Sequence, residues 1–116
     1  MLEGHYYQNG MVCDDIEAGI ELFRARGKVR DRIHVIDIDQ MVQSPRGPLR
    51  QYQKICFIWI ENIQYELIQS LGDPGIYANC QPNGGPLRFH HTCTRVSDWQ
   101  DFRARVDLQD FPIAFE

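Results

Sequence analysis

Residues 54–68 read KICFIWIENIQYELI, and this stretch decides the predicted fold. Residues 54–60 form a nearly continuous apolar run of strand length, rich in the β-branched and aromatic types that favour strands. The polar pair at 61–62 is typical of a tight turn, and residues 63–68 form the next strand. A β-hairpin is therefore expected, with Glu66 inside its second strand.

Outward from this hairpin, the chain predicts more strands. They are expected at residues 6–13, 32–41, 87–96 and 111–115. The segment SPRGPLRQ, residues 44–51, is expected to be a loop because of its prolines and glycine. Residues 72–85 are expected to hold a loop or a short helix. These elements favour an α+β domain.

Two helices are predicted from capping signals. Asp14 with Glu17, and Ser97 with Gln100, have the spacing of a capping box, and Gly27 is expected to end the first helix. The expected buried stripes are Ile16, Ile20 and Phe23 in the first helix and Trp99, Phe102 and Val106 in the second.

Composition narrows the class of protein. A chain of 116 residues predicts one compact domain with its own core. The net charge is −4 and there is no Lys/Arg run, so neither nucleic acid nor an anionic membrane surface is an expected partner. The longest apolar run, residues 55–60, is too short to span a bilayer, and residues 1–10 do not have the features of a secretory signal.

Cysteine usage points to the cytoplasm. The four cysteines, at positions 13, 56, 80 and 93, form no CxxC pair. Three of them fall in apolar strand patterns, where a free cysteine acts as a small hydrophobe. We therefore expect reduced thiols in a cytoplasmic protein.

The order of elements suggests an internal repeat. A strand and a helix open the chain, and a strand and a helix return after the connection. Placing Gln8 over His91, a shift of 83, brings Asp15 onto Asp98. The two polar side chains, Gln8 and His91, thus begin equivalent strands.

Three polar side chains could hold a metal ion. Glu66 stands among apolar neighbours, where a carboxylate is costly unless it is paired or bound to a metal. Together with Gln8 and His91 it would suit a borderline divalent ion such as Zn²⁺, Ni²⁺, Co²⁺ or Mn²⁺. His90, one residue from His91, is expected to face the other side of the sheet.

The segments YYQNGMVCDDI (6–16), IQYELIQSL (63–71) and GPLRFHHTCTRVSDW (85–99) resemble the glyoxalase / vicinal-oxygen-chelate superfamily, nearest to glyoxalase I and methylmalonyl-CoA epimerase. The resemblance implies paired βαβββ modules that form a curved mixed sheet with helices on its convex side. Residues 1–84 would be the first module and its connection. Residues 85–116 would begin an incomplete second module as strand, helix and strand.

The resemblance also implies the site. It assigns Gln8, Glu66 and His91 as metal ligands. The 58-residue spacing between Gln8 and Glu66, repeated after His91, would put a fourth ligand near position 149, outside this sequence. The resemblance further implies that the protein forms a homodimer.

The implied activity is that of a lyase, isomerase or epimerase. The metal would polarise a substrate carbonyl, and a carboxylate, here Glu66, would remove the neighbouring proton to give an enediolate. From their charge and loop positions, Arg46, Arg50 and Arg88 are expected to hold an anionic group of the substrate. The expected substrate is a small molecule, either a carboxylate or a thioester.

Two other functions stay open. An Fe(II) ring-cleaving dioxygenase would need two histidines and a carboxylate, and Gln8 disfavours it. A non-catalytic relative of the bleomycin-resistance type would bind a small molecule without metal. The missing fourth ligand favours that alternative, whereas Glu66 and His91 disfavour it.

Overall fold

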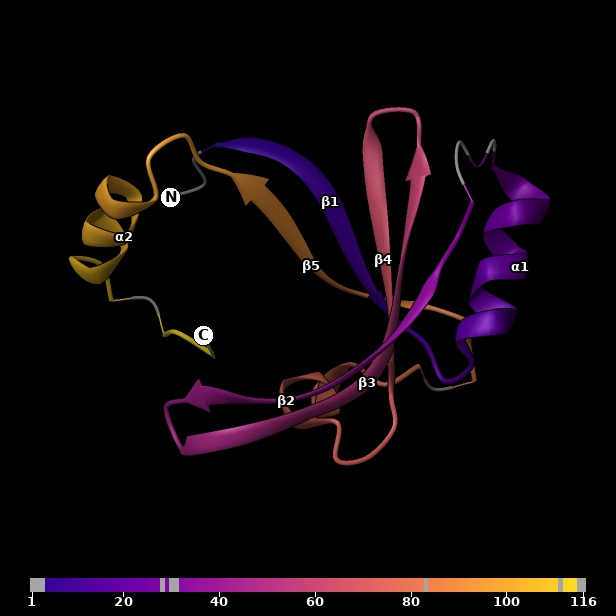
Figure 1. The fold of residues 1–116 in the computed structure, drawn as a ribbon, viewed down its shortest axis with the longest axis horizontal. Helices are drawn as coiled ribbons and strands as arrows, with labels where there is room; N and C mark the ends of the chain where they lie inside the picture. Colours follow the sequence, from indigo (N-terminus) through magenta and orange to yellow (C-terminus); the bar gives the residue numbers. More distant parts are fainter. Residues whose placement is uncertain (1–3, 28, 30–31, 83, 111, 115–116) are drawn as a thin grey trace.

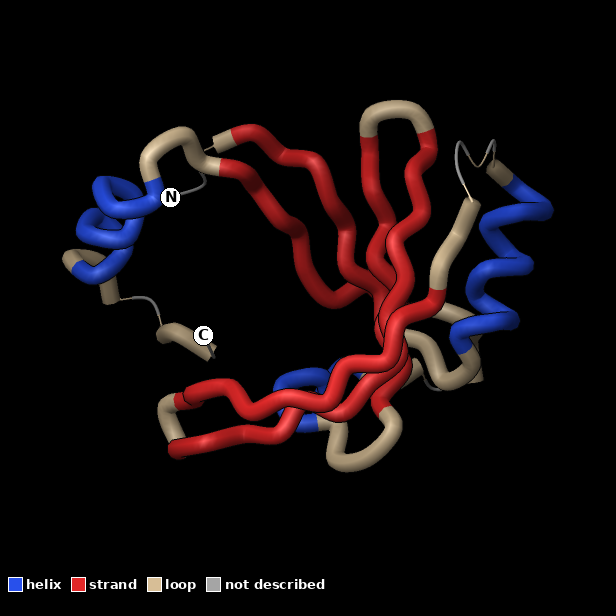
Figure 2. The backbone as a smooth tube through the Cα atoms, viewed as in Figure 1, coloured by secondary structure: helices blue, strands red, loops and turns tan. Residues whose placement is uncertain are grey.

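The computed structural model describes residues 4–27, 29, 32–82, 84–110 and 112–114. It has an α+β fold built on one curved, mixed sheet of five strands in the order β2-β3-β4-β1-β5 (Figures 1 and 2). The strands are β1 (His5–Val12), β2 (Val35–Ser44), β3 (Gly47–Ile60), β4 (Ile63–Ser70) and β5 (Arg88–Arg95). The helices are α1 (Ile16–Arg26), the short 3₁₀ helix η1 (Gly75–Cys80) and α2 (Trp99–Asp107).

The predicted hairpin is confirmed. β3 and β4 pair antiparallel from Ile60 opposite Ile63 to Gln53 opposite Ser70, around the turn at 61–62. Glu61 has a φ of 53°, the left-handed conformation that such tight connections often use. β4 then pairs in parallel with β1, and β5 pairs antiparallel with the other edge of β1.

The loop predicted at 44–51 is wrong except at residues 45 and 46, because Ser44 ends β2. β3 begins at Gly47, and β2 and β3 pair without a break up to Ser44 opposite Gly47. Two residues make the turn, and the Ser44 hydroxyl donates to the Gly47 carbonyl at 2.7 Å. β3 pairs only with β2 before Gln53, so Pro48 lies where one side of the strand is open. Such an edge tolerates a residue without an N–H.

Both helices begin one residue later than predicted. The N-cap of α1 is Asp15, not Asp14, and its Oδ1 accepts from the backbone N–H of Glu17 at 3.0 Å. The N-cap of α2 is Asp98, not Ser97, and it accepts from the Asp101 N–H at 2.9 Å. In each case an aspartate takes the role, as one of the strongest capping residues. Gly27 ends α1 as predicted.

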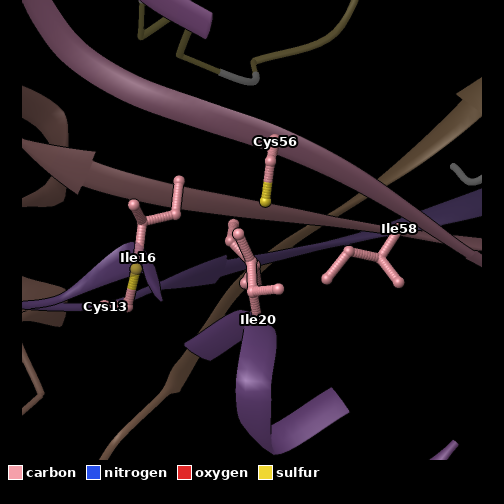
Figure 3. Close-up of a cluster of buried hydrophobic side chains, with 6 residues drawn as sticks. Cys13, Ile16, Ile20, Cys56 and Ile58 are labelled. Carbon is pink, nitrogen blue, oxygen red and sulfur yellow. The ribbon is translucent and has the colours of Figure 1, made fainter. Parts of the chain in front are cut away.

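The sheet buries a different cluster on each face. α1 lies outside the curve of the sheet (Figure 1), and its Ile16 and Ile20 pack in one buried cluster with Cys13, Cys56, Ile58 and Leu67 (Figure 3). The opposite face packs against η1 through Val12, Ile55, Ile68 and Tyr77. Because side chains alternate along a strand, β4 directs Leu67 toward α1 and its neighbour Glu66 toward the other face.

The second half of the chain departs from expectation. α2 has no buried residue, and Trp99, predicted to lie in a buried stripe, is 61% exposed. The reason is that α2 stands away from the sheet, beyond the end of β5 (Figure 1). Residues 112–114 form no strand, contrary to the strand predicted at 111–115, whose two end residues lie outside the described part. No helix in the described ranges is both long and apolar enough to cross a membrane.

Buried thiols should resist alkylation. All four cysteines are free, and burial raises the pKa of Cys13 to about 12 and that of Cys56 to about 11. At pH 8 only about one Cys13 side chain in 10⁴ would be the reactive thiolate. We expect iodoacetamide to label the half-buried Cys80 and Cys93 first, measured by peptide mass spectrometry. Unfolding in guanidinium chloride should expose all four, and equal labelling of Cys13 in the native protein would contradict this burial.

Candidate metal site

Three adjacent strands bring together residues that are far apart in the sequence. Gly10, in β1, lies opposite Glu66 on β4 and opposite His91 on β5. One step along the same face, Gln8 lies opposite Gln64 and Cys93. The three residues predicted as ligands, Gln8, Glu66 and His91, therefore share the sheet face opposite α1.

Glu66 and His91 meet across the middle strand. The imidazole Nε2 of His91 lies 3.3 Å from the carboxylate Oε2 of Glu66, with 28% and 16% of the two side chains exposed. They can meet because the residue between them is glycine. A Cβ at Gly10 would overlap the imidazole of His91, so the ring occupies the space that any other residue would fill.

The distance between the two atoms is compatible with two ligands of one ion. Ligands bound at about 2.1 Å with octahedral to tetrahedral angles lie roughly 3.0–3.4 Å apart. The 3.3 Å separation of Nε2 and Oε2 falls within that range. An imidazole nitrogen and a carboxylate oxygen are also donors that Zn²⁺, Ni²⁺, Co²⁺ and Mn²⁺ accept. Glu66 and His91 therefore fit a divalent ion.

Gln8 is the third polar side chain on this face. It is only 5% exposed, and its Nε2 donates to Oε1 of Gln64 at 2.6 Å. With the amide N–H engaged in this way, the amide oxygen is the atom through which Gln8 could bind an ion. Within the described ranges, no group of three or more His, Cys, Asp or Glu side chains could hold a metal ion.

The prediction that His90 faces away from His91 is wrong. The register of β5 shifts between His91, opposite Gly10, and Phe89, opposite Met11, so His90 is the extra residue of a β-bulge. The bulge brings the two imidazoles together, with their Nδ1 atoms 2.9 Å apart. Alternation along an unbroken strand, on which the prediction rested, does not hold at a bulge.

Tyr77, in η1, lies next to the group formed by Glu66, His90 and His91. Its ring lies 4.7 Å from the ring of His90, and its pKa is raised to about 12, mainly by burial and next by the charge of Glu66. Burial, followed by the neighbouring His91, lowers the pKa of His90. The pKa of Cys93 is raised by burial and then by Glu66. No residue pattern in the predicted 72–85 connection singled out Tyr77.

The three candidate arginines lie elsewhere. Arg46 is in the turn between β2 and β3, where its backbone N–H donates to the Ser44 hydroxyl. Arg50 holds Asp39 through two hydrogen bonds of 2.7 and 2.8 Å. Arg88, at the start of β5, donates to the backbone carbonyl of Gln81. The structure thus puts Glu66 in contact with His91 and Gln8 on the same sheet face, whereas the three arginines lie away from this pair.

No protein-family model matches the chain, and no curated protein matches it. The chemistry of the site therefore rests on the residues and their geometry.

Proposed function

We propose that this chain is a metal-dependent lyase, isomerase or epimerase of the vicinal-oxygen-chelate type, with Gln8, Glu66 and His91 as metal ligands. One observation carries the proposal: a carboxylate and an imidazole from β4 and β5 meet over Gly10 at a distance suited to one shared ion. Three protein ligands would leave coordination positions for water or substrate, the usual arrangement of a catalytic rather than a structural site.

The topology supports the same proposal. Strand β1, helix α1 and the β2-β3-β4 meander form one βαβββ unit, and β5 with α2 repeats its beginning. The two helix caps, Asp15 and Asp98, each follow the proposed ligands Gln8 and His91 by seven residues. We propose that residues 1–84 and 85–116 correspond to two related modules, and that the protein acts as a homodimer.

The proposed chemistry is proton transfer next to a carbonyl group. A bound divalent ion would polarise that carbonyl. The carboxylate of Glu66 takes a proton from the adjacent carbon, the electron pair of the C–H bond passes into the carbonyl group, and the same carboxylate returns the proton. The partly buried position of Glu66, 16% exposed, limits competition from bulk water. The substrate class is a small carbonyl compound such as a carboxylate or thioester.

A second candidate function is metal-free binding of a small molecule. Glu66 and His91 can pair directly, with Nε2 and Oε2 3.3 Å apart, so neither side chain needs an ion as its partner. In that case the sheet face would bind its ligand without catalysis.

Metal titration separates the two. We expect the purified protein to bind about one Zn²⁺, Ni²⁺, Co²⁺ or Mn²⁺ ion per chain, measured by calorimetry and elemental analysis. Glu66→Gln keeps an oxygen but removes the charge, and should weaken binding by roughly tenfold to a hundredfold. Glu17→Gln removes the same charge from α1 on the other face and should leave affinity unchanged. A wild-type protein that binds none of these ions would overturn the proposed function.

A further inference from the structure

His90 is held in place on two sides. One side faces His91, with Nδ1 to Nδ1 at 2.9 Å, and the other packs on the ring of Tyr77. It also has a hydrogen bond with the backbone of Ile76 in η1. Tyr77 is itself 6% exposed and hydrogen-bonded with Gln53 of β3. His90 is therefore fixed to the body of the domain through η1.

A histidine that binds a metal ion through one ring nitrogen needs a hydrogen-bond partner for the other. A neutral imidazole carries one proton, so a histidine that binds an ion through Nε2 must carry its proton on Nδ1. That Nδ1–H needs an acceptor, which orients the ring and sets the tautomer. Nε2 of His91 faces Glu66, and Nδ1 of His91 faces Nδ1 of His90. His90 is thus placed to receive the hydrogen bond that presents the Nε2 lone pair to an ion.

We propose that His90 is a positioning residue, which orients the His91 ring toward Glu66 and selects its tautomer. This role rests on the proposed function, because it matters for metal binding only if His91 is a ligand. The contacts from which it is inferred are present without a metal ion. When no ion is bound, an Nε2–H of a neutral His91 can donate toward Glu66 Oε2, 3.3 Å away, and Nδ1 of His91 then accepts. An imidazole at position 90 serves in both states because it can donate or accept at Nδ1.

Two substitutions separate hydrogen bonding from packing. His90→Phe keeps a ring against Tyr77 but removes the partner of His91. His90→Asn loses the ring, yet its amide can donate or accept near the position of Nδ1. For Zn²⁺ alone at one fixed pH, we expect His90→Phe to bind about tenfold to a hundredfold more weakly and His90→Asn to stay within about threefold of wild type. The control His34→Phe changes an exposed histidine outside the site and should have no effect.

The metal-free protein gives a second, independent measurement. Nitrogen-15 NMR of the wild type should show coupling between the two Nδ1 atoms across their hydrogen bond, and His90→Phe should abolish it and change the His91 tautomer. Absence of that coupling in the wild type, or Zn²⁺ affinity of His90→Phe equal to wild type, would overturn the positioning role. If the wild type shows the coupling but binds no ion, the proposed function fails and the role of His90 in orienting His91 stands.

Discussion

Gly10→Ala should lower metal affinity by more than about a hundredfold, beyond the usual effect of losing a residue that only supports a ligand. The added methyl group would occupy the space of the His91 imidazole, which must then turn away from Glu66. The three atoms nearest to it are all ring atoms of His91, and a ring can rotate. Gly10 also lies outside the positive-φ glycines, so alanine fits its backbone. The free energy of unfolding should therefore fall by no more than about 1–3 kcal/mol, the cost of separating Glu66 from its partner.

The test is whether Gly10→Ala lowers metal affinity much more than it lowers the free energy of unfolding. Calorimetric titration measures the affinity, and urea unfolding measures the stability. Gly72→Ala is the matched control because its methyl group would meet only Tyr52, at an ordinary 3.6 Å. Unchanged metal binding by Gly10→Ala would show that the ion, if bound, does not lie between Glu66 and His91.

Leu67→Ala should destabilise the protein by about 2–5 kcal/mol, a large part of the roughly 5–15 kcal/mol that holds a domain folded. Leu67 is completely buried in the cluster under α1. A Cβ built on Gly19 of α1 would come within 3.1 Å of a Leu67 methyl group, so the helix backbone packs tightly above this side chain. Such a close neighbour leaves little freedom for the cavity to collapse.

Equilibrium unfolding in urea gives the size of the effect, read from the midpoint at constant slope. Leu108→Ala makes the same chemical change at a side chain that is 87% exposed, and should alter stability by less than about 0.5 kcal/mol. A similar loss for both variants would contradict the core described under α1.

The central part of the fold could be predicted from the sequence. The run at 54–60, the polar turn and the strand after it specify a hairpin through local pattern alone. The first helix followed from its apolar spacing and from Gly27. These features depend on neighbours along the chain, which a single sequence displays.

Features that depend on distant contacts could not be predicted. Pro48 suggested a loop, but it is tolerated because β4 does not reach that part of β3. Trp99 suggested a core position, but no element of the described chain buries it. The bulge at His90 is set by pairing with β1, and nothing local marks it. Glu66 and His91 were grouped as ligands through the resemblance of their segments, whereas the position of Gly10 between them needed the structure.

The parallel pairing of β1 with β4 has a consequence for how the chain folds. It joins residues 56 positions apart, such as Gln8 and Gln64, whereas β2, β3 and β4 follow one another through short turns. Closing so long a loop is slow compared with forming a hairpin. The meander is therefore expected to form first, with β1 and β5 docking in the rate-limiting step. Since Glu66 and His91 meet only across β1, an ion that bridges them would bind only after that step and would slow unfolding rather than speed folding.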